Sequence, residues 1–277
     1  MDVDKPGRLR FLARMRALPA SRLCLPLLVS LVVTQARPAA AMVGAADAPA
    51  SLARHVVLIV GSHGTSCTGA VLAKNLVLTA AHCVQPGSDY KLVTFDAARQ
   101  PTLLDVATIA RHPGFDMKSL LGHRATADVA LMKTAASLPE TFSPAPLARL
   151  ETLSVGQRFT VAGMGVAVRG DGRSGGTVRA ADLIATGRPG TLQLRLMDPA
   201  TKGERPGAGA CTGDSGAPVF SLGAAPAIAG VVSWSTGPKL SAGCGGLTGV
   251  TPLIRYRGWI VDTARALGSS VGSPAAP

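Results

Sequence analysis

The chain has 277 residues, of which 16% are charged and 4% aromatic, and its formal net charge is +12. Residues 1–41 alone contain seven basic and two acidic residues, and the basic residues downstream are scattered along the chain. This length allows one large domain or two small ones, while scattered positive charge argues against a nucleic-acid-binding surface. We therefore expect no nucleic-acid partner.

The first 41 residues have the pattern of an export signal. A basic stretch reaches Arg22, an eleven-residue apolar core follows at 23–33, and three alanines end at Ala41. That core is about half of the roughly 20 residues that span a bilayer. The pattern predicts a signal peptide over residues 1–41, cleavage after Ala41, and a secreted or periplasmic protein without stable membrane association. Because the basic leader is long, an uncleaved anchor remains the alternative.

Short apolar segments separated by turn residues follow, and each is typical of a β-strand. In the first half they are residues 55–60, 66–72, 76–79, 91–95, 103–109 and 129–133. A proline-containing stretch at 134–157 is typical of a surface linker. The second set comprises residues 158–162, 177–186, 192–196, 218–221, 228–233 and 249–251. Two sets of strands predict an all-β fold of two small barrels.

The last element has a different period. Apolar residues recur at three- and four-residue intervals at positions 253, 256, 260, 264 and 267, which predicts one amphipathic helix that ends at Gly268. We expect an N-terminal barrel at 42–135, and a linker, a C-terminal barrel and this helix at 136–268. Residues 269–277 are expected to form a disordered tail.

Four cysteines remain after removal of residues 1–41: Cys67, Cys83, Cys211 and Cys244. An even number in an exported chain indicates two disulfides, but four cysteines allow three pairings. Zinc is the competing explanation. Since the sequence has no C-x-x-C pair, we expect no metal.

The segment at residues 210–220 has the composition of a nucleophile site. Ser215 lies between Gly213 and Gly216, with Asp214 directly before it. Glycine allows the backbone to bend sharply and to approach a ligand closely. Neighbouring amides can then stabilise the oxyanion of an acyl-transfer intermediate. A glycine-rich turn between strands is the alternative for this segment alone.

A serine nucleophile needs a base and a group that orients the base. His82 follows an apolar strand and two alanines and precedes a cysteine, whereas the other four histidines lie in polar or turn-like settings and are expected at the surface. Asp128 opens an apolar strand, where a buried carboxylate requires a partner.

Three segments together resemble the trypsin-like (chymotrypsin-fold) serine peptidases: Thr-Ala-Ala-His-Cys at 79–83, Asp-Val-Ala-Leu at 128–131 and Gly-Asp-Ser-Gly at 213–216. The order His, Asp, Ser and the spacings of 46 and 87 residues also fit. The resemblance, which runs from Met42 to about residue 261, suggests an exported bacterial member. It implies two six-stranded antiparallel Greek-key barrels packed face to face, with a C-terminal helix.

The resemblance also implies roles for individual residues. His82, Asp128 and Ser215 would be the catalytic triad, and the amides of Gly213 and Ser215 the oxyanion hole. A free amine at Met42 would form an ion pair with Asp214. The implied disulfides are Cys67–Cys83 and Cys211–Cys244.

A substrate pocket is implied around Gly209, the strand residues Ser233, Trp234 and Ser235, and Gly249 on the opposite wall. Trypsins carry an aspartate at the position of Gly209, so we expect a neutral pocket that favours small or medium apolar residues. No calcium or other cofactor is expected.

The expected function is that of a monomeric serine endopeptidase with polypeptide substrates and, as a further partner, a protein inhibitor. Two other classes remain. An α/β-hydrolase esterase would need a histidine after its serine, and none follows Ser215. A catalytically silent binding protein with the same fold is the alternative function.

Overall fold

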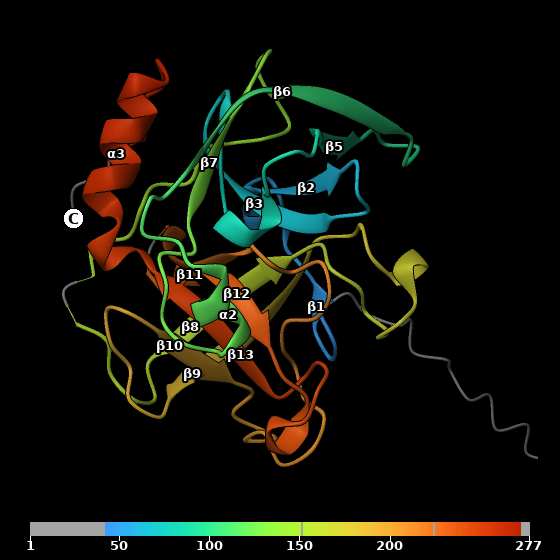
Figure 1. The fold of residues 1–277 in the computed structure, drawn as a ribbon. Helices are drawn as coiled ribbons and strands as arrows, with labels where there is room; N and C mark the ends of the chain where they lie inside the picture. Colours follow the sequence, from blue (N-terminus) through green and yellow to red (C-terminus); the bar gives the residue numbers. More distant parts are fainter. Residues whose placement is uncertain (1–41, 151, 224, 273–277) are drawn as a thin grey trace, which may run out of the picture. The chain divides into compact units, whose positions relative to one another are not determined.

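The computed structural model describes residues 42–150, 152–223 and 225–272. The expected signal peptide at 1–41 lies outside the described residues. An N-terminal barrel closes in the strand order β2-β3-β4-β7-β6-β5, in which all pairs are antiparallel (Figure 1). Its strands are β2 (Val56–Gly61), β3 (Ser66–Ala73), β4 (Leu76–Thr79), β5 (Tyr90–Phe95), β6 (Pro101–Arg111) and β7 (Ala130–Thr134).

A second set of six strands forms the C-terminal barrel. The order β9-β10-β13-β12-β11-β8 closes because β8 also pairs with β9, and the short β1 (Ala46–Asp47) adds to the β9 edge. The strands are β8 (Arg158–Gly163), β9 (Arg179–Thr186), β10 (Leu194–Met197), β11 (Pro218–Ser221), β12 (Ala227–Ser235) and β13 (Leu247–Pro252). The predicted all-β fold of two antiparallel Greek-key barrels is confirmed.

The helices are few and short. They are α1 (Ala50–Ala53), α2 (Met117–Leu121) and α3 (Arg257–Ala266), with single 3₁₀ turns at Ala81–Cys83, Gly172–Ser174, Pro238–Leu240 and Leu253–Arg255. The predicted C-terminal helix is confirmed, although its first turn is 3₁₀. Within the described residues no helix is long and apolar enough to cross a membrane.

The described residues form three clusters of buried apolar side chains. One fills each barrel, and the third joins the facing sides of both barrels to α3. In this third cluster Leu78 and Leu131 of the N-terminal barrel meet Phe220 of the C-terminal barrel and Ile260 of α3. Burial of apolar side chains is the main stabilising contribution in such a contact. The cluster therefore holds β4 and β7 of one barrel against β11 of the other.

The chain after α3 departs from the expectation of a disordered tail. Gly268 has a positive φ of 67° and ends the helix, as predicted. The hydroxyl of Ser269 then bonds the Asn75 side chain at 2.8 Å, and Val271 packs against the cluster between the barrels. Residues 269–272 are thus held by contacts that are remote in sequence, while residues 273–277 lie outside the described part.

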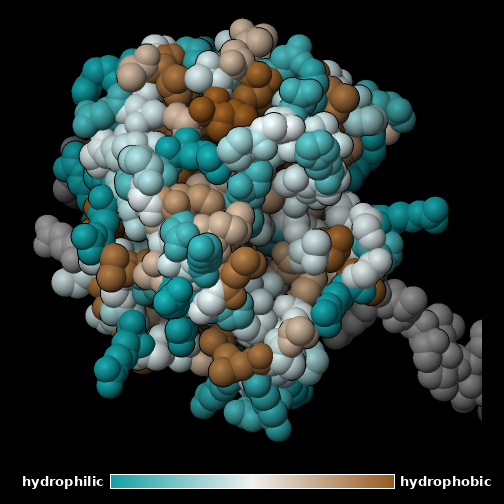
Figure 2. All heavy atoms as spheres, viewed as in Figure 1, coloured by the Kyte–Doolittle hydropathy of each residue, from teal (hydrophilic) through white to brown (hydrophobic). Residues whose placement is uncertain are grey.

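The surface is mixed in character. Exposed large apolar side chains are dispersed over different elements, among them Leu103, Leu121, Leu192 and Leu240. Figure 2 shows hydrophobic residues in small separate groups among hydrophilic ones on the face that it displays. Single exposed apolar residues of this kind are ordinary for a folded protein.

Candidate active site

His82 and Asp128 meet at one edge of the N-terminal barrel. His82 lies in the 3₁₀ turn that follows β4, and Asp128 lies just before β7. Because β4 and β7 are antiparallel, with Thr79 opposite Ala130, the residue after one strand lies close to the residue before the other. Asp128 is fully buried and accepts bonds from the His82 ring Nδ1 at 2.8 Å and from the His82 amide at 2.9 Å. The imidazole is therefore oriented, with its Nε2 atom directed away from the carboxylate.

A third donor to Asp128 comes from the other barrel. The Ser233 hydroxyl donates to Asp128 Oδ2, the carboxylate oxygen that also contacts His82 Nδ1. Ser233 lies where the register between β12 and β13 shifts, between Val232 and Trp234, and such a bulge redirects a side chain. This contact spans 105 residues, and the sequence had indicated Ser233 only as part of a substrate strand. No local sequence signal reveals the bulge.

Ser215 lies in a sharply bent segment before β11. Gly213 and Gly216 have positive φ values of 92° and 80°, which favour glycine. A side chain at Gly216 would also collide with the Thr68 carbonyl oxygen, 2.3 Å from the position of a Cβ atom. Thr68 of β3 fastens the segment further, since its amide bonds the Ser215 carbonyl and its hydroxyl bonds the Gly213 carbonyl, both at 2.8 Å. The N-terminal barrel thus holds the serine loop of the C-terminal barrel.

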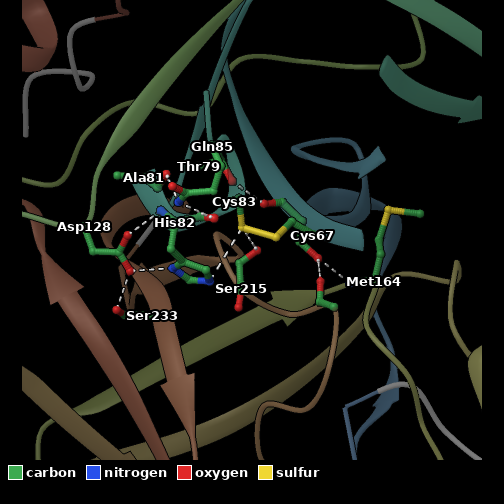
Figure 3. Close-up of a disulfide and its surroundings, with 12 residues drawn as sticks. Cys67, Thr79, Ala81, His82, Cys83, Gln85, Asp128, Met164, Ser215 and Ser233 are labelled. Carbon is green, nitrogen blue, oxygen red and sulfur yellow. Dashed lines mark hydrogen bonds and ion pairs between the residues drawn. A yellow bond between two sulfur atoms is a disulfide. The ribbon is translucent and has the colours of Figure 1, made fainter. Parts of the chain in front are cut away.

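Ser215 and His82 both lie against the Cys67–Cys83 disulfide (Figure 3). The Cys83 Sγ atom is 3.8 Å from His82 Nε2 and 3.6 Å from the Ser215 carbonyl oxygen. Within the described residues no hydrogen bond joins the Ser215 hydroxyl to the imidazole. Nucleophile–base bonds are often long in a substrate-free enzyme and tighten when substrate binds. The structure therefore brings the three side chains together, with the Asp–His half already bonded.

The amides of Gly213 and Ser215 are available to a ligand. In the part of the chain that the structure describes, neither N–H donates a hydrogen bond to the protein, although Gly213 is buried. Buried N–H groups are rarely left without an acceptor. Two such donors beside a serine hydroxyl suit an oxyanion.

Asp214 points away from Ser215 into the C-terminal barrel. Its fully buried carboxylate accepts bonds from the amides of Gly165 and Cys211, each at 2.9 Å. Gly163 leaves the necessary space, because a Cβ atom there would lie 2.1 Å from a carboxylate oxygen. Burial raises the pKa of Asp214 to about 7, although the two amide bonds favour the charged form. Within the described residues no cationic group forms an ion pair with this buried carboxylate.

Met42 lies in the same part of the C-terminal barrel. Its side chain is fully buried in the apolar cluster that includes Ala210 and Ala217, on either side of the Asp214 segment. The Val43 carbonyl accepts a bond from the Gly209 amide at 3.1 Å. The chain at Met42 is thus inserted beside the residues that precede the nucleophile.

The residues expected around the substrate pocket lie on two faces of one sheet. Thr248 provides the nearest side chain to Gly209, with its hydroxyl oxygen 3.4 Å from the position of a Cβ atom there, and this oxygen also accepts a bond from the Ala210 amide. Gly249 is on the opposite face, beneath the Trp234 ring. Since side chains alternate along a strand, Ser235, which is opposite Thr248, shares the face of Gly209. The sequence indicated Gly249 as a wall and missed Thr248.

The described part of the chain contains two disulfides, Cys67–Cys83 and Cys211–Cys244. This is the pairing that the family resemblance implied. Cys67, His82 and Cys83 place their ligand-type atoms within 4.8 Å of one another, but both sulfur atoms belong to the disulfide. A disulfide sulfur is not the thiolate that binds zinc.

Two histidines outside this site differ from the expectation of a surface position. His112 is half-buried against Tyr256 and Trp259. His55 is buried, and its ring bonds the Ser143 carbonyl, whereas the sequence predicted a surface residue. Burial lowers its pKa, as expected for a histidine without a carboxylate partner. The linker residue Ser143 folds back onto Arg54 and His55, just before β2, a contact that strand patterns do not predict.

Comparison with known proteins supports the trypsin-like family that the sequence resembles. The profile of the family described as Trypsin matches residues 42–260. Human kallikrein-8 is 28% identical over 207 residues, which are 70% of this chain and 75% of that protein. Trypsin alpha of Drosophila erecta is 27% identical over 223 residues, 75% of this chain and 80% of that protein. The solved structure of human heparin binding protein has a TM-score of 0.62 and 25% identity, and the match covers 84% of this chain and 100% of that one. With a bonded Asp–His pair, a serine between positive-φ glycines and a profile match across both barrels, the chain belongs to the trypsin family.

Proposed function

We propose that this protein is an exported serine endopeptidase, made as a precursor with a signal peptide at residues 1–41. The observation that carries the proposal is the oriented imidazole of His82, bonded through Nδ1 to a buried carboxylate and packed with Ser215 against the Cys83 sulfur (Figure 3). His82 is 18% exposed and Ser215 half-buried, so a substrate can reach both. Polypeptides are the proposed substrates, and a monomer is the proposed working form.

The proposed reaction is acyl transfer. The Ser215 oxygen attacks the peptide carbonyl carbon while His82 Nε2 takes the hydroxyl proton. The amides of Gly213 and Ser215 donate to the oxyanion. When the C–N bond breaks, His82 returns the proton to the leaving amine. Water, deprotonated by the same imidazole, then attacks the acyl-enzyme ester, and the imidazolium returns the proton to the Ser215 oxygen as the C–O bond breaks and the carboxylic acid product leaves.

A fluorophosphonate probe tests this proposal. It bonds covalently to a serine only when a base and an oxyanion site activate the hydroxyl. We expect one adduct on Ser215 of the folded protein and none after denaturation. The alternative is a catalytically silent binding protein, a possibility favoured by the name of human heparin binding protein, which shares the fold. Absence of the adduct from well-folded protein would support that alternative.

The neutral pocket predicts which bonds are cleaved. Gly209 and Thr248 bring no charge to its base, so a peptide library should be cleaved after small or medium apolar residues. The Gly209→Asp change should raise cleavage after Arg or Lys, relative to Ala, by about 100-fold, because it adds a counter-charge. A Cβ atom fits at this position, with its nearest neighbours 3.4 Å away.

Gly209→Asn is the matched control, since it has nearly the same size without the charge. Wild-type protein that cleaves mainly after Arg or Lys would contradict the proposed specificity. An equal increase in cleavage after Arg or Lys in the Gly209→Asp and Gly209→Asn variants would also contradict it.

Asp214 predicts a pH dependence that depends on the N-terminus. While the chain continues upstream of Met42, the raised pKa near 7 means that the folded state binds a proton more tightly than the unfolded state. The free energy of unfolding should then fall between pH 4 and 7, by up to about 1.4 kcal/mol per pH unit. If cleavage frees the Met42 amine and it pairs with Asp214, that loss should disappear.

Urea denaturation of two matched proteins, one starting at Met42 and one with upstream residues retained, measures the difference. The paired amine gains a raised pKa, so its stabilisation is present below its unfolded pKa of about 7.7 and is lost as the pH rises through the folded value. Identical pH profiles for both proteins would refute the ion pair.

A further inference from the structure

β12 has a free edge beside the nucleophile. β11 pairs with residues Ala227 to Val231 of β12, and β13 covers the other side as far as Ser235. Within the described residues no strand pairs with the remaining edge at Trp234 and Ser235. An extended peptide can add to such an edge by backbone hydrogen bonds. In an antiparallel peptide the residue at the cleaved bond would lie beside Ser215. The residues that precede it in the peptide would extend along β12 toward Gly237.

Side-chain alternation decides which peptide residues face Trp234. Ser235 and Thr248 share the face of Gly209, while Trp234 is on the other face. If the residue at the cleaved bond, counted as the first, points toward Gly209, the second and fourth residues point toward Trp234. The third points away from the ring. The fourth is about 7 Å beyond the second, in the direction of Gly237.

The Trp234 side chain lies over Gly249 of the neighbouring strand β13, and Arg195 of β10 lies on the far side of Gly249. Arg195 is opposite Gly249, and Gly249 is opposite Trp234, so the three form a row across β10, β13 and β12. A Cβ atom at Gly249 would lie 2.0 Å from the indole, so only glycine accommodates the ring there. The Arg195 guanidinium carbon is 5.9 Å from the centre of the ring. Glycine at 249 therefore brings an aromatic ring and a cation together.

A histidine from the other barrel covers this ring. His123, in the loop after α2, stacks on Trp234 with ring centres 4.6 Å apart and planes 9° apart. Its carbonyl accepts a bond from the Gln193 side chain at 3.2 Å, which ties the loop to the start of β10. An approaching side chain therefore meets the polar imidazole of His123 rather than the bare indole face of Trp234.

The surroundings of Trp234 are positively charged. Arg124 lines the small depression on one side of the ring, and Arg195, Lys202 and Lys239 line a larger one of about 260 Å³ that reaches Gly237. Among the described residues that line these two depressions, the only acid is Glu204, which is 4.0 Å from Lys239. The two depressions that the fourth peptide residue would approach are therefore lined by more basic than acidic side chains.

We propose that Arg195, held against Trp234, selects an acidic side chain at the fourth residue before the cleaved bond. The preferred substrates are thus peptides with Asp or Glu at that position and a small apolar residue at the bond. This inference deepens the proposed peptidase function. It concerns binding, however, and can be tested without turnover.

Binding to the Ser215→Ala protein tests the proposal. Three fluorescein-labelled peptides of equal length carry alanine at the bond and differ upstream, with Glu at the fourth residue, Glu at the third, or Lys at the fourth. Fluorescence polarisation should show that Glu at the fourth residue binds about fivefold more tightly than Glu at the third, and about tenfold more tightly than Lys. The two Glu peptides have the same net charge, so the comparison excludes a general attraction to a basic protein.

Variants assign the preference to Arg195. Arg195→Met should reduce the fivefold difference to less than about twofold, Arg195→Lys should keep most of it, and raising the salt from about 0.05 to 0.5 M should weaken it. Arg265→Met, an exposed arginine of α3, is the control for loss of a charge elsewhere.

Three results would overturn the inference: equal binding of the two Glu peptides, a preference that survives Arg195→Met, or no peptide binding to folded protein. Fluorophosphonate labelling of the wild type reports separately on the peptidase proposal, so one can fail without the other.

Discussion

Replacing Ser215 with alanine is expected to reduce kcat/KM for a peptide substrate by about a millionfold. The hydroxyl oxygen is the proposed nucleophile, and it lies between two positive-φ glycines, beside the amides of Gly213 and Ser215, which donate to no acceptor among the described residues. Alanine removes only the hydroxyl oxygen and leaves the Ser215 carbonyl in its bond to the Thr68 amide. Thermal unfolding should therefore be nearly unchanged. Initial rates on a fluorogenic peptide measure the loss.

Ser241→Ala, on a surface turn, is the matched control and should retain wild-type activity. Residual activity of Ser215→Ala above about one part in a thousand would contradict the assignment of the nucleophile. An unchanged rate would indicate that hydrolysis came from a contaminant or from a different site.

Asp128→Asn is expected to lower kcat by about 10⁴-fold with little change in KM. Asn has the shape of Asp, but its amide nitrogen cannot accept the proton of His82 Nδ1. The imidazole then favours the tautomer with the proton on Nε2, which cannot act as a base toward Ser215. Steady-state kinetics of the folded variant measure this loss.

Two companion variants sharpen the result. Ser233→Ala removes one of three donors to Asp128 but leaves the His82 contacts, so its loss should be far smaller, about tenfold. Asp182→Asn changes an exposed carboxylate that contacts Thr160 and should have no effect on kcat. If Asp128→Asn retained more than about a tenth of the wild-type rate, the carboxylate would not be orienting the base.

Much of the fold follows from local patterns. All of the expected strands occur, and those at 76–79 and 218–221 have the predicted bounds. Runs of buried apolar residues bounded by turn chemistry indicate strands wherever they occur, since this signal lies within a few residues. The short helix α2 was missed, because five residues are too few to show a helical period.

The sequence by itself determined the residue types and order of the site. Serine between glycines, histidine after a strand and aspartate before one are local signals, and together they indicated His82, Asp128 and Ser215. Cysteine count likewise indicated two disulfides. The pairing was implied by resemblance alone, because four cysteines allow three pairings.

Tertiary structure decided which face of a strand each residue occupies and which distant groups it meets. A register shift of one residue exchanges the two faces of a strand, and this places Thr248 beside Gly209 and Gly249 beneath Trp234. The bulge in β12 turns Ser233 toward Asp128, which is 105 residues away in the chain. Such contacts depend on register and on barrel closure, which are set by the packing of the whole domain, and a single strand's sequence does not contain them.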